Sequence, residues 1–213
     1  MKQVNLYPIW ILGIQQYKGV IVINNYNLLD YSDIRLIGKS IYLRKCITSD
    51  CNNEYLGWLN DPLVNQYLET RWTKQTIDKI TQFVNEIAQS EHSLLFAIIA
   101  KKSEKHIGNI KIGPIHPHYA YADVSYFIGN RDYWGKGLAT EAVSLVMDFA
   151  FNELKLRRVQ AGCFEKNIGS LNVLRKTGFS LEGTLRKQLL DTNGQWQDHL
   201  FFGKLNETLI NKI

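Results

Sequence analysis

The sequence contains only three cysteines, and their placement excludes the usual functions of cysteine clusters. Cys46, Cys51 and Cys163 form no Cys-x-x-Cys pair and no combined cysteine and histidine pattern. Neither a zinc site nor a disulfide framework is therefore indicated, and we expect no bound metal. Free thiols are typical of proteins in a reducing compartment, so the expected location is the cytoplasm.

Long apolar runs and blocks of one charge are also missing. The N-terminal run Ile9–Leu12 is too short to span a bilayer, and no small-residue cleavage site follows it. The net charge is +5, but the densest basic cluster, at residues 101–105, is interrupted by a serine and a glutamate. We therefore expect neither a membrane nor a nucleic-acid partner.

The composition that remains is typical of one soluble globular domain. The 213 residues are 45% hydrophobic and 21% charged, and they contain no internal repeat or linker. Residues 1–37 are the hardest to interpret: the runs at 9–14 and 19–23 could be strands of an added hairpin or arm. A compact domain is expected to begin at residue 38 and to continue to residue 213.

Hydrophobic periodicity predicts the elements of this domain. Strands are expected at residues 40–46, 94–100, 107–112, 122–129, 158–164, 181–190 and 195–205. Helices are expected at 49–59, 64–68, 138–149 and 167–176, with a longer one through residue 87 that Thr73 or Thr76 could cap, and a loop at 113–118. The continuous apolar run 94–100 is typical of a strand buried on both faces. This order of elements indicates an α/β fold with a mixed sheet.

The stretch from residue 126 to 142 has the features of an anion-binding site. A strand-like run, Tyr126–Ile128, leads through turn residues to Gly135-Lys136-Gly137, and Leu138 begins a helix with one apolar face. The first turn of a helix has unpaired N–H groups and the positive end of the dipole, and glycines let a phosphate approach closely. The local pattern alone leaves open whether these glycines bind a phosphate or only form a tight turn.

Three motifs in register resemble the GCN5-related N-acetyltransferase (GNAT) superfamily, in particular its branch of ribosomal-protein N-terminal acetyltransferases. The superfamily's acetyl-CoA signature is Arg/Gln-x-x-Gly-x-Gly/Ala. It is matched by Trp134-Gly135-Lys136-Gly137-Leu138-Ala139, with tryptophan in the Arg/Gln position. A second motif runs from Asn167 to Phe179 and a third from Trp58 to Leu68. The resemblance covers residues 38 to 205.

This resemblance implies the fold, the reaction and the cofactor contacts. The fold would be a mixed, mostly antiparallel central sheet of about six to seven strands flanked by about four helices. The reaction would be transfer of an acetyl group from acetyl-CoA to a primary amine by direct attack in a ternary complex. The implied cofactor contacts are Phe127, Ile128, Gly129, Trp134, Gly135, Lys136, Gly137, Leu138, Ala139, Thr140, Asn167, Ser170 and Asn172.

The general acid of many family members, a tyrosine, is absent because Leu174 occupies its position. Ser170 matches a serine that serves the leaving thiolate in the ribosomal-protein branch, so it is the candidate acid. The alternative is a hydroxyl on the helix surface without a catalytic part. Cys163 lies in a core-type strand without an adjacent His or Lys, which favours a buried, inert thiol.

The general base is less clearly indicated than the acid. Asp123, on the strand that leads to the glycine motif, is the first candidate. Glu69, His116 and His118 are the others, and a base acting through water is equally open.

The motifs do not identify the acceptor. A protein N-terminus, a small-molecule amine and a nucleotide-linked amino sugar all remain open, as does a monomer or a homodimer. The residues expected to contact the acceptor mix aromatic and charged side chains: Asn65, Tyr67, Glu69, Arg71, Tyr121 and Arg186. A non-catalytic acyl-CoA-binding module is the competing hypothesis, because the family's tyrosine is missing.

Overall fold

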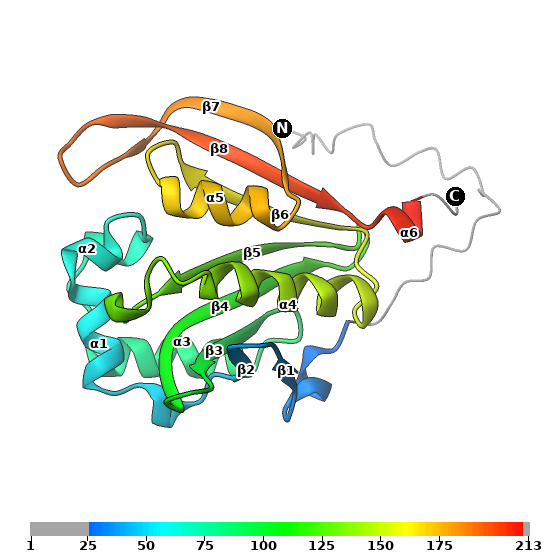
Figure 1. The fold of residues 1–213 in the computed structure, drawn as a ribbon, viewed down its shortest axis with the longest axis horizontal. Helices are drawn as coiled ribbons and strands as arrows, with labels where there is room; N and C mark the ends of the chain where they lie inside the picture. Colours follow the sequence, from blue (N-terminus) through cyan, green and yellow to red (C-terminus); the bar gives the residue numbers. More distant parts are fainter. Residues whose placement is uncertain (1–25, 211–213) are drawn as a thin grey trace, which may run out of the picture.

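The computed structural model describes residues 26–210, and the two possible strands at 9–14 and 19–23 lie outside this range. One sheet of eight strands runs through these residues in the order β1-β2-β3-β4-β5-β6-β8-β7 (Figure 1). Every neighbouring pair is antiparallel except β5 and β6. The predicted α/β class with a mixed, mostly antiparallel sheet is confirmed, with one strand more than expected.

The elements have the following bounds. The strands are β1 Arg35–Ile37, β2 Ile41–Lys45, β3 Leu94–Ala100, β4 Lys105–His116, β5 Tyr121–Ile128, β6 Arg158–Phe164, β7 Ser180–Leu190 and β8 Trp196–Leu205. The helices are α1 Asn53–Asn60, α2 Pro62–Asn65, α3 Ile77–Ala88, α4 Leu138–Asn152, α5 Ile168–Lys176 and α6 Glu207–Ile210. Four 3-10 turns are η1 Leu28–Tyr31, η2 Thr48–Asp50, η3 Glu69–Trp72 and η4 Arg131–Tyr133.

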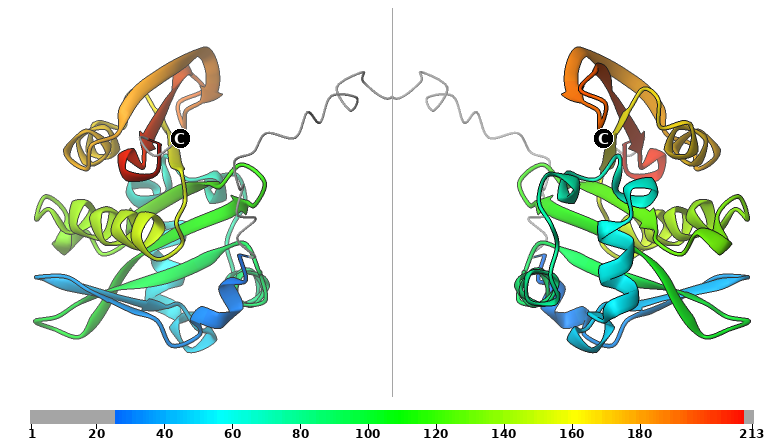
Figure 2. Two further views of the ribbon diagram at one scale, coloured as in Figure 1. Left: turned by 90° about the vertical axis from the view of Figure 1, so that its right-hand side faces the viewer. Right: turned by 90° about the vertical axis from the view of Figure 1, so that its left-hand side faces the viewer.

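Helices cover both faces of the sheet, and each face has its own core (Figure 2). Strand β3 contributes to both cores, as its continuous apolar run predicts. Phe96 and Ile98 pack with α4 and α5 on one face, which we call the α4 face. Leu95 and Ala97 pack with α1 and α3 on the other, the α1 face. All seven residues of β3 are buried, so this strand fixes the position of the helix layers.

Residues 26–37, which the sequence analysis placed in an extension, pack with the domain. Leu28 is fully buried in the α4-face core. Arg35–Ile37 form β1, which pairs with β2 at the edge of the sheet and is the unexpected eighth strand. A strand of three residues is too short to show an alternating pattern, which is why the sequence did not reveal it.

Two boundaries differ from the prediction, the first because side chains change the local hydrogen bonding. The helix expected from residue 49 begins at Asn53, since both carboxylate oxygens of Asp50 accept from Arg44, at 2.6 and 2.7 Å. Asn52 caps α1 instead, accepting from the N–H groups of Glu54 and Tyr55. Strand β4 continues through the expected loop at 113–118 as far as His116, with a register shift after Ile112.

Strands β5 and β6 pair over three residues only and then separate. Tyr121–Asp123 pair with Arg158–Gln160, after which β5 continues beside β4 and β6 continues beside β8. We call the unpaired stretches, residues 124–128 of β5 and 161–164 of β6, the splay. Figure 1 shows the two strands meeting at one end and diverging toward α5 and α2. The splay therefore opens a gap in the middle of an otherwise continuous sheet.

Candidate active site

The loop before α4 has the geometry of an anion-binding site. Gly135 and Gly137 have φ angles of +71° and +76°, a region that side chains disfavour, and a Cβ on either residue would meet nothing within 4 Å. Gly137 is the N-cap of α4 and provides no side-chain acceptor. The first turn of α4 therefore follows a loop with free space beside its glycines and has no side-chain cap, and its N–H groups and the helix dipole suit a phosphate.

Neighbouring side chains hold this loop in place. Glu141, in the first turn of α4, accepts hydrogen bonds from the N–H groups of Ser40 (2.8 Å) and Ile41 (3.3 Å), which ties the helix start to β2. The Trp134 indole donates to the carbonyl oxygen of Ile128 at 2.7 Å, which ties the loop to the end of β5. The site is thus formed before any ligand binds, which lowers the entropic cost of binding.

A polar cluster lies on the α4 face of the splay, between β5, β6 and α5. The Tyr126 hydroxyl is 3.0 Å from Oγ of Ser170, and the Cys163 thiol also hydrogen-bonds Ser170. Asn167 caps α5 by accepting from the N–H of Ser170 at 3.1 Å. We call Tyr126, Cys163 and Ser170 the Ser170 cluster.

Burial keeps the members of this cluster protonated. Desolvation raises the pKa of the Cys163 thiol to about 11, so a thiolate nucleophile is not available at neutral pH. Burial also raises the pKa of the Tyr126 phenol, which therefore stays protonated, and its hydroxyl donates to the Ser170 carbonyl oxygen at 3.3 Å. Leu174, at the position of the family's tyrosine, is fully buried in the core and takes no part in this cluster.

A second group lies on the α1 face of the splay. Phe164 of β6 contacts the ring of Tyr67 at 5.2 Å between centroids, and the Arg71 guanidinium lies 5.1 Å from the Phe164 ring. His199 of β8 pairs with Phe164 and lies over Gly162, where an added methyl group would overlap the imidazole. Tyr67, Glu69, Arg71, Phe164 and His199 are called the α1-face cluster below.

Arg71 is a structural member of this cluster. Its side chain is only 4% exposed, and its guanidinium donates to the carbonyl oxygens of Leu68 (2.7 Å) and Leu190 (3.0 Å) and lies 4.4 Å from the Trp72 ring. Its ion-pair partner Glu69 is 76% exposed. The face therefore presents a carboxylate to solvent, while the arginine links η3 to β7.

The remaining predicted residues are placed as follows. Asp123 is on the α1 face by strand alternation and pairs with Gln160 in the last paired position before the splay. His116 stacks on Tyr121 at 4.2 Å, at the other end of β5 from the glycine loop. Asn65 donates to the Leu59 carbonyl oxygen at 2.8 Å. Exposed residues without a role in either cluster are His118, Asn172 and Arg186, and Lys136 lies exposed near the Tyr133 ring.

Sequence reasoning missed Tyr126 and His199. In the sequence, Tyr126 is part of a strand-like run, and His199 is one residue within the expected strand 195–205. Strand alternation on β5 and the serine four positions into the second motif were visible in the sequence, but the pairing of β8 with β6 was not. His199 could therefore be placed at the splay only from the three-dimensional structure.

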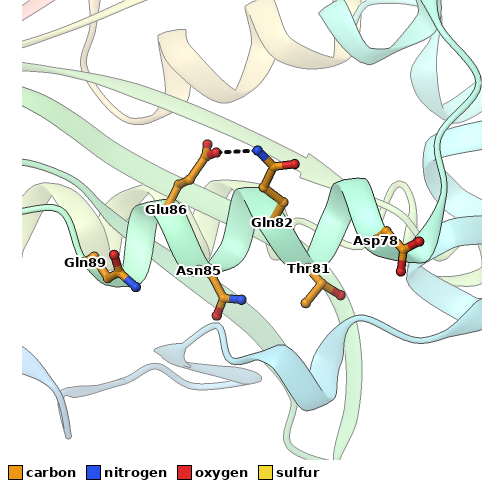
Figure 3. A pocket seen from close by; sticks show the side chains of 6 residues that line it. All are labelled: Asp78, Thr81, Gln82, Asn85, Glu86 and Gln89. Carbon is orange, nitrogen blue, oxygen red and sulfur yellow. Dashed lines mark hydrogen bonds between the residues drawn. The ribbon is translucent and has the colours of Figure 1, made fainter.

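An open groove on the outer surface of α3 is separate from the splay. Its lining comes from this single helix: Asp78, Thr81, Gln82, Asn85, Glu86 and Gln89 (Figure 3). Gln82 donates to Glu86 at 2.8 Å, and no residue of the splay contributes. Among residues 26–210, no His, Cys, Asp and Glu group is placed to hold a metal ion, and no helix is long and apolar enough to cross a membrane.

Known proteins resemble this chain in sequence and in fold. The acetyltransferase (GNAT) domain family matches residues 40–180. The probable N-acetyltransferase YjcK of Bacillus subtilis is 32% identical over 181 residues, which is 80% of this chain and 97% of YjcK. A GNAT-family acetyltransferase from Bacillus anthracis superposes with a TM-score of 0.70 at 24% identity, covering 82% of this chain and 99% of that one. The ribosomal alpha-N-protein acetyltransferase RimL, in complex with coenzyme A, gives 0.72 at 18% identity, covering 81% and 98%.

Proposed function

Because the chain belongs to the GNAT acetyltransferase family, we propose that it transfers an acetyl group from acetyl-CoA to a primary amine within a ternary complex at the splay. The chain is an acetyl-CoA-dependent N-acetyltransferase, because it has a GNAT domain and its relatives are named N-acetyltransferases. The proposal adds where the two substrates bind, which groups move protons and what class of acceptor is used.

The observation that carries the proposal is the uncapped start of α4 behind two left-handed glycines with open space around them. We assign the pyrophosphate of acetyl-CoA to the N–H groups of residues 135–140. Hydrogen bonds to a charged group contribute roughly 1.5–3 kcal/mol each, so a few of them suffice to anchor the nucleotide end. The pantetheine arm would follow residues 127–129 of β5 into the splay, where the edge of the strand is unpaired.

The Ser170 cluster supplies the acid in this proposal. An amine that attacks the thioester carbon expels a thiolate, and a nearby donor lowers the cost of that charge. The backbone N–H of Ser170 donates to the side-chain oxygen of Asn167, which fixes the position of the residue. The Oγ of Ser170 also hydrogen-bonds the Tyr126 hydroxyl. The Tyr126 hydroxyl would hydrogen-bond the Ser170 oxygen as Ser170 gives up its proton, in a site that has leucine at position 174.

The charge on the α1 face favours a cationic acceptor. The Arg71 guanidinium is buried and its two terminal nitrogens donate to backbone carbonyl oxygens, whereas the Glu69 carboxylate is exposed. A nucleotide-linked sugar would bring phosphates toward this carboxylate, while an ammonium group would be attracted to it. We therefore propose an ammonium-bearing acceptor, either a polypeptide N-terminus or a small polyamine. RimL, by its name, acts on a protein alpha-amine, which is in line with the first class.

A turnover assay distinguishes acetyl transfer from the competing function, a non-catalytic acyl-CoA-binding module. Purified protein is mixed with acetyl-CoA and a panel that contains spermidine, peptides with free N-termini and a nucleotide-linked amino sugar, and release of free thiol is followed. Calorimetric titration with CoA runs in parallel. We expect CoA binding, with turnover on a peptide or on spermidine. Binding without turnover on any amine supports the binding module, and no binding at all refutes the proposed site.

A further inference from the structure

We propose that His199 is the general base of this site and takes a proton from the acceptor amine on the α1 face of the splay. The inference rests on the proposed function, and it assigns a group that neither the motifs nor the relatives indicate. It depends on three features: the position of His199 relative to Ser170, the hydrogen bond to its ring, and the charges around it.

The first feature is position. Along β6, Cys163 points to the α4 face, where its thiol reaches Ser170. Gly162 precedes it and is exposed on the opposite side, and the His199 ring lies directly over this glycine. The candidate acid, Ser170, therefore lies beside Cys163, and the candidate base, His199, lies beside the preceding residue of β6. The two groups are on opposite faces of the splay. This suits a displacement in which the amine enters from one face and the thiolate leaves toward the other.

Asp123 is less well placed for the same task. Successive residues of a strand advance by about 3.3 Å, and Gln160, its partner, lies two residues before Gly162. Asp123 is thus at the closed end of the splay, where β5 and β6 are still hydrogen-bonded. The Arg158 guanidinium, which also pairs with Glu182, lies close enough to Asp123 to interact with its charge.

The second feature is the tautomer. Nδ1 of His199 lies 2.7 Å from the side-chain oxygen Oε1 of Gln188 on β7. An amide oxygen only accepts, so Nδ1 carries the proton and Nε2 keeps its lone pair. Nε2 is also the ring atom nearest to a Cβ added at Gly162, so it lies on the side of the ring that faces β6 and the splay. The hydrogen bond to Gln188 thus prepares the nitrogen that faces the splay to accept a proton.

The third feature is charge. Partial burial lowers the pKa of His199, and the Glu69 carboxylate opposes this shift. Arg71 is paired with Glu69, and the contacts from β6, β7 and β8 are the uncharged Gly162, Gln188 and Phe201. Because its pKa lies below the ordinary value, the imidazole is neutral at pH 7 and free to accept a proton. Glu69 would attract the ammonium and stabilise the imidazolium that forms.

The proton balance of the step is complete. Nε2 takes one proton from the ammonium group, and the freed lone pair forms the C–N bond to the thioester carbon. As the C–S bond breaks, its electron pair leaves on sulfur, which takes a proton from Ser170. The nitrogen loses its second proton as the amide forms. Of the two protons released by nitrogen, one replaces the proton given to sulfur and the other goes to solvent.

The kinetic test compares His199→Asn with His92→Asn. The asparagine amide can still donate to Gln188, but it cannot act as a base. His92 is an exposed residue before β3 that belongs to neither cluster, and it serves as the matched control. With the amine that gives turnover, wild type and His92→Asn should lose kcat/KM as the pH falls below about 6.5, the ordinary histidine pKa. His199→Asn should be slower at pH 7 by about 100-fold or more.

The shape of the pH profile of kcat/KM distinguishes a catalytic role of His199 from a structural one. In His199→Asn, the limb of the profile, meaning the fall of kcat/KM at low pH that is due to the histidine, should disappear. Instead, kcat/KM should rise with pH toward the acceptor's own pKa, because only the free amine then reacts. CoA affinity should be unchanged. Glu69→Gln should move the limb of the otherwise intact enzyme to lower pH, since the carboxylate raises the pKa of His199. If His199→Asn keeps the wild-type limb and rate, the inference is wrong while the proposed function stands.

A second readout needs no acceptor. Nitrogen NMR of histidine-labelled protein reports which ring nitrogen is protonated. The signals of His199, assigned by their loss in His199→Asn, should show a protonated Nδ1, an unprotonated Nε2 and a pKa below 6.5. A protonated Nε2 at neutral pH would overturn the inference even if no amine on the panel reacts. Gly162→Ala should change these shifts and reduce turnover, because the added methyl displaces the ring.

Discussion

Replacement of Gly137 by tryptophan tests the phosphate site, and Gly194→Trp provides a matched control. Both glycines have left-handed backbones, with φ of +76° and +73°, and neither has an atom within 4 Å of an added Cβ. A side chain in that conformation costs about 1–2 kcal/mol. Gly137 lies at the start of α4, whereas Gly194 lies in the turn between β7 and β8. The two variants therefore share the backbone cost and differ in what the indole covers.

The expected stability loss is similar for both variants. At this chain length 1 kcal/mol lowers Tm by roughly 2–4 °C, so each variant should melt roughly 2–8 °C below wild type. CoA binding should separate them. If the indole at position 137 prevents two amide–phosphate hydrogen bonds, the loss is about 3–6 kcal/mol, or roughly 10²–10⁴-fold in Kd.

Calorimetric titration with CoA and thermal melts measure both quantities on the same samples. We expect Gly194→Trp to bind CoA within a few-fold of wild type. Equal CoA affinities for Gly137→Trp and Gly194→Trp would show that the pyrophosphate does not lie on the first turn of α4, and the placement of the cofactor would have to be abandoned.

Three further changes test the chemistry and the core. Ser170→Ala should lower kcat by about 100-fold with CoA affinity unchanged, as steady-state kinetics and calorimetry would show; an unchanged kcat removes Ser170 from the mechanism. Tyr126→Phe removes the phenol 3.0 Å from Ser170 Oγ and should lower kcat less than Ser170→Ala, and the double variant should be no worse than Ser170→Ala if the two groups act in series. Leu174→Ala opens a cavity at a fully buried core position and should cost about 2–5 kcal/mol in denaturant unfolding, and a loss below 1 kcal/mol would contradict that burial.

Periodicity predicted the elements whose own side chains decide their structure. The apolar run of β3 gave a strand buried on both faces, because every side chain must then find a core. Thr76 caps α3 and Asn167 caps α5, and both are residue types that local chemistry favours at a helix N-cap. The left-handed glycines before α4 likewise follow from the sequence, since few other residues adopt that conformation.

Features that depend on distant partners could not be predicted in this way. Strand β1 forms because it can pair with the free edge of β2. Asp50 does not begin helix α1, because its carboxylate accepts hydrogen bonds from Arg44. Arg71, which we expect to contact the acceptor, also donates to the carbonyl oxygens of Leu68 and Leu190, the second of which is 119 residues away in sequence. His199 reaches the splay only because β8 inserts between β6 and β7.

Direct transfer at the splay is tested most directly by a single turnover with acetyl-CoA labelled in the acetyl group. Enzyme in excess is mixed with labelled acetyl-CoA and the best amine from the panel, and intact-protein and small-molecule mass spectra are recorded over time. Direct attack predicts one labelled acetyl group on the amine for each CoA released, with the protein mass unchanged throughout. Label that passes through the protein, on Cys163 or Ser170, before it reaches the amine would contradict direct attack in a ternary complex.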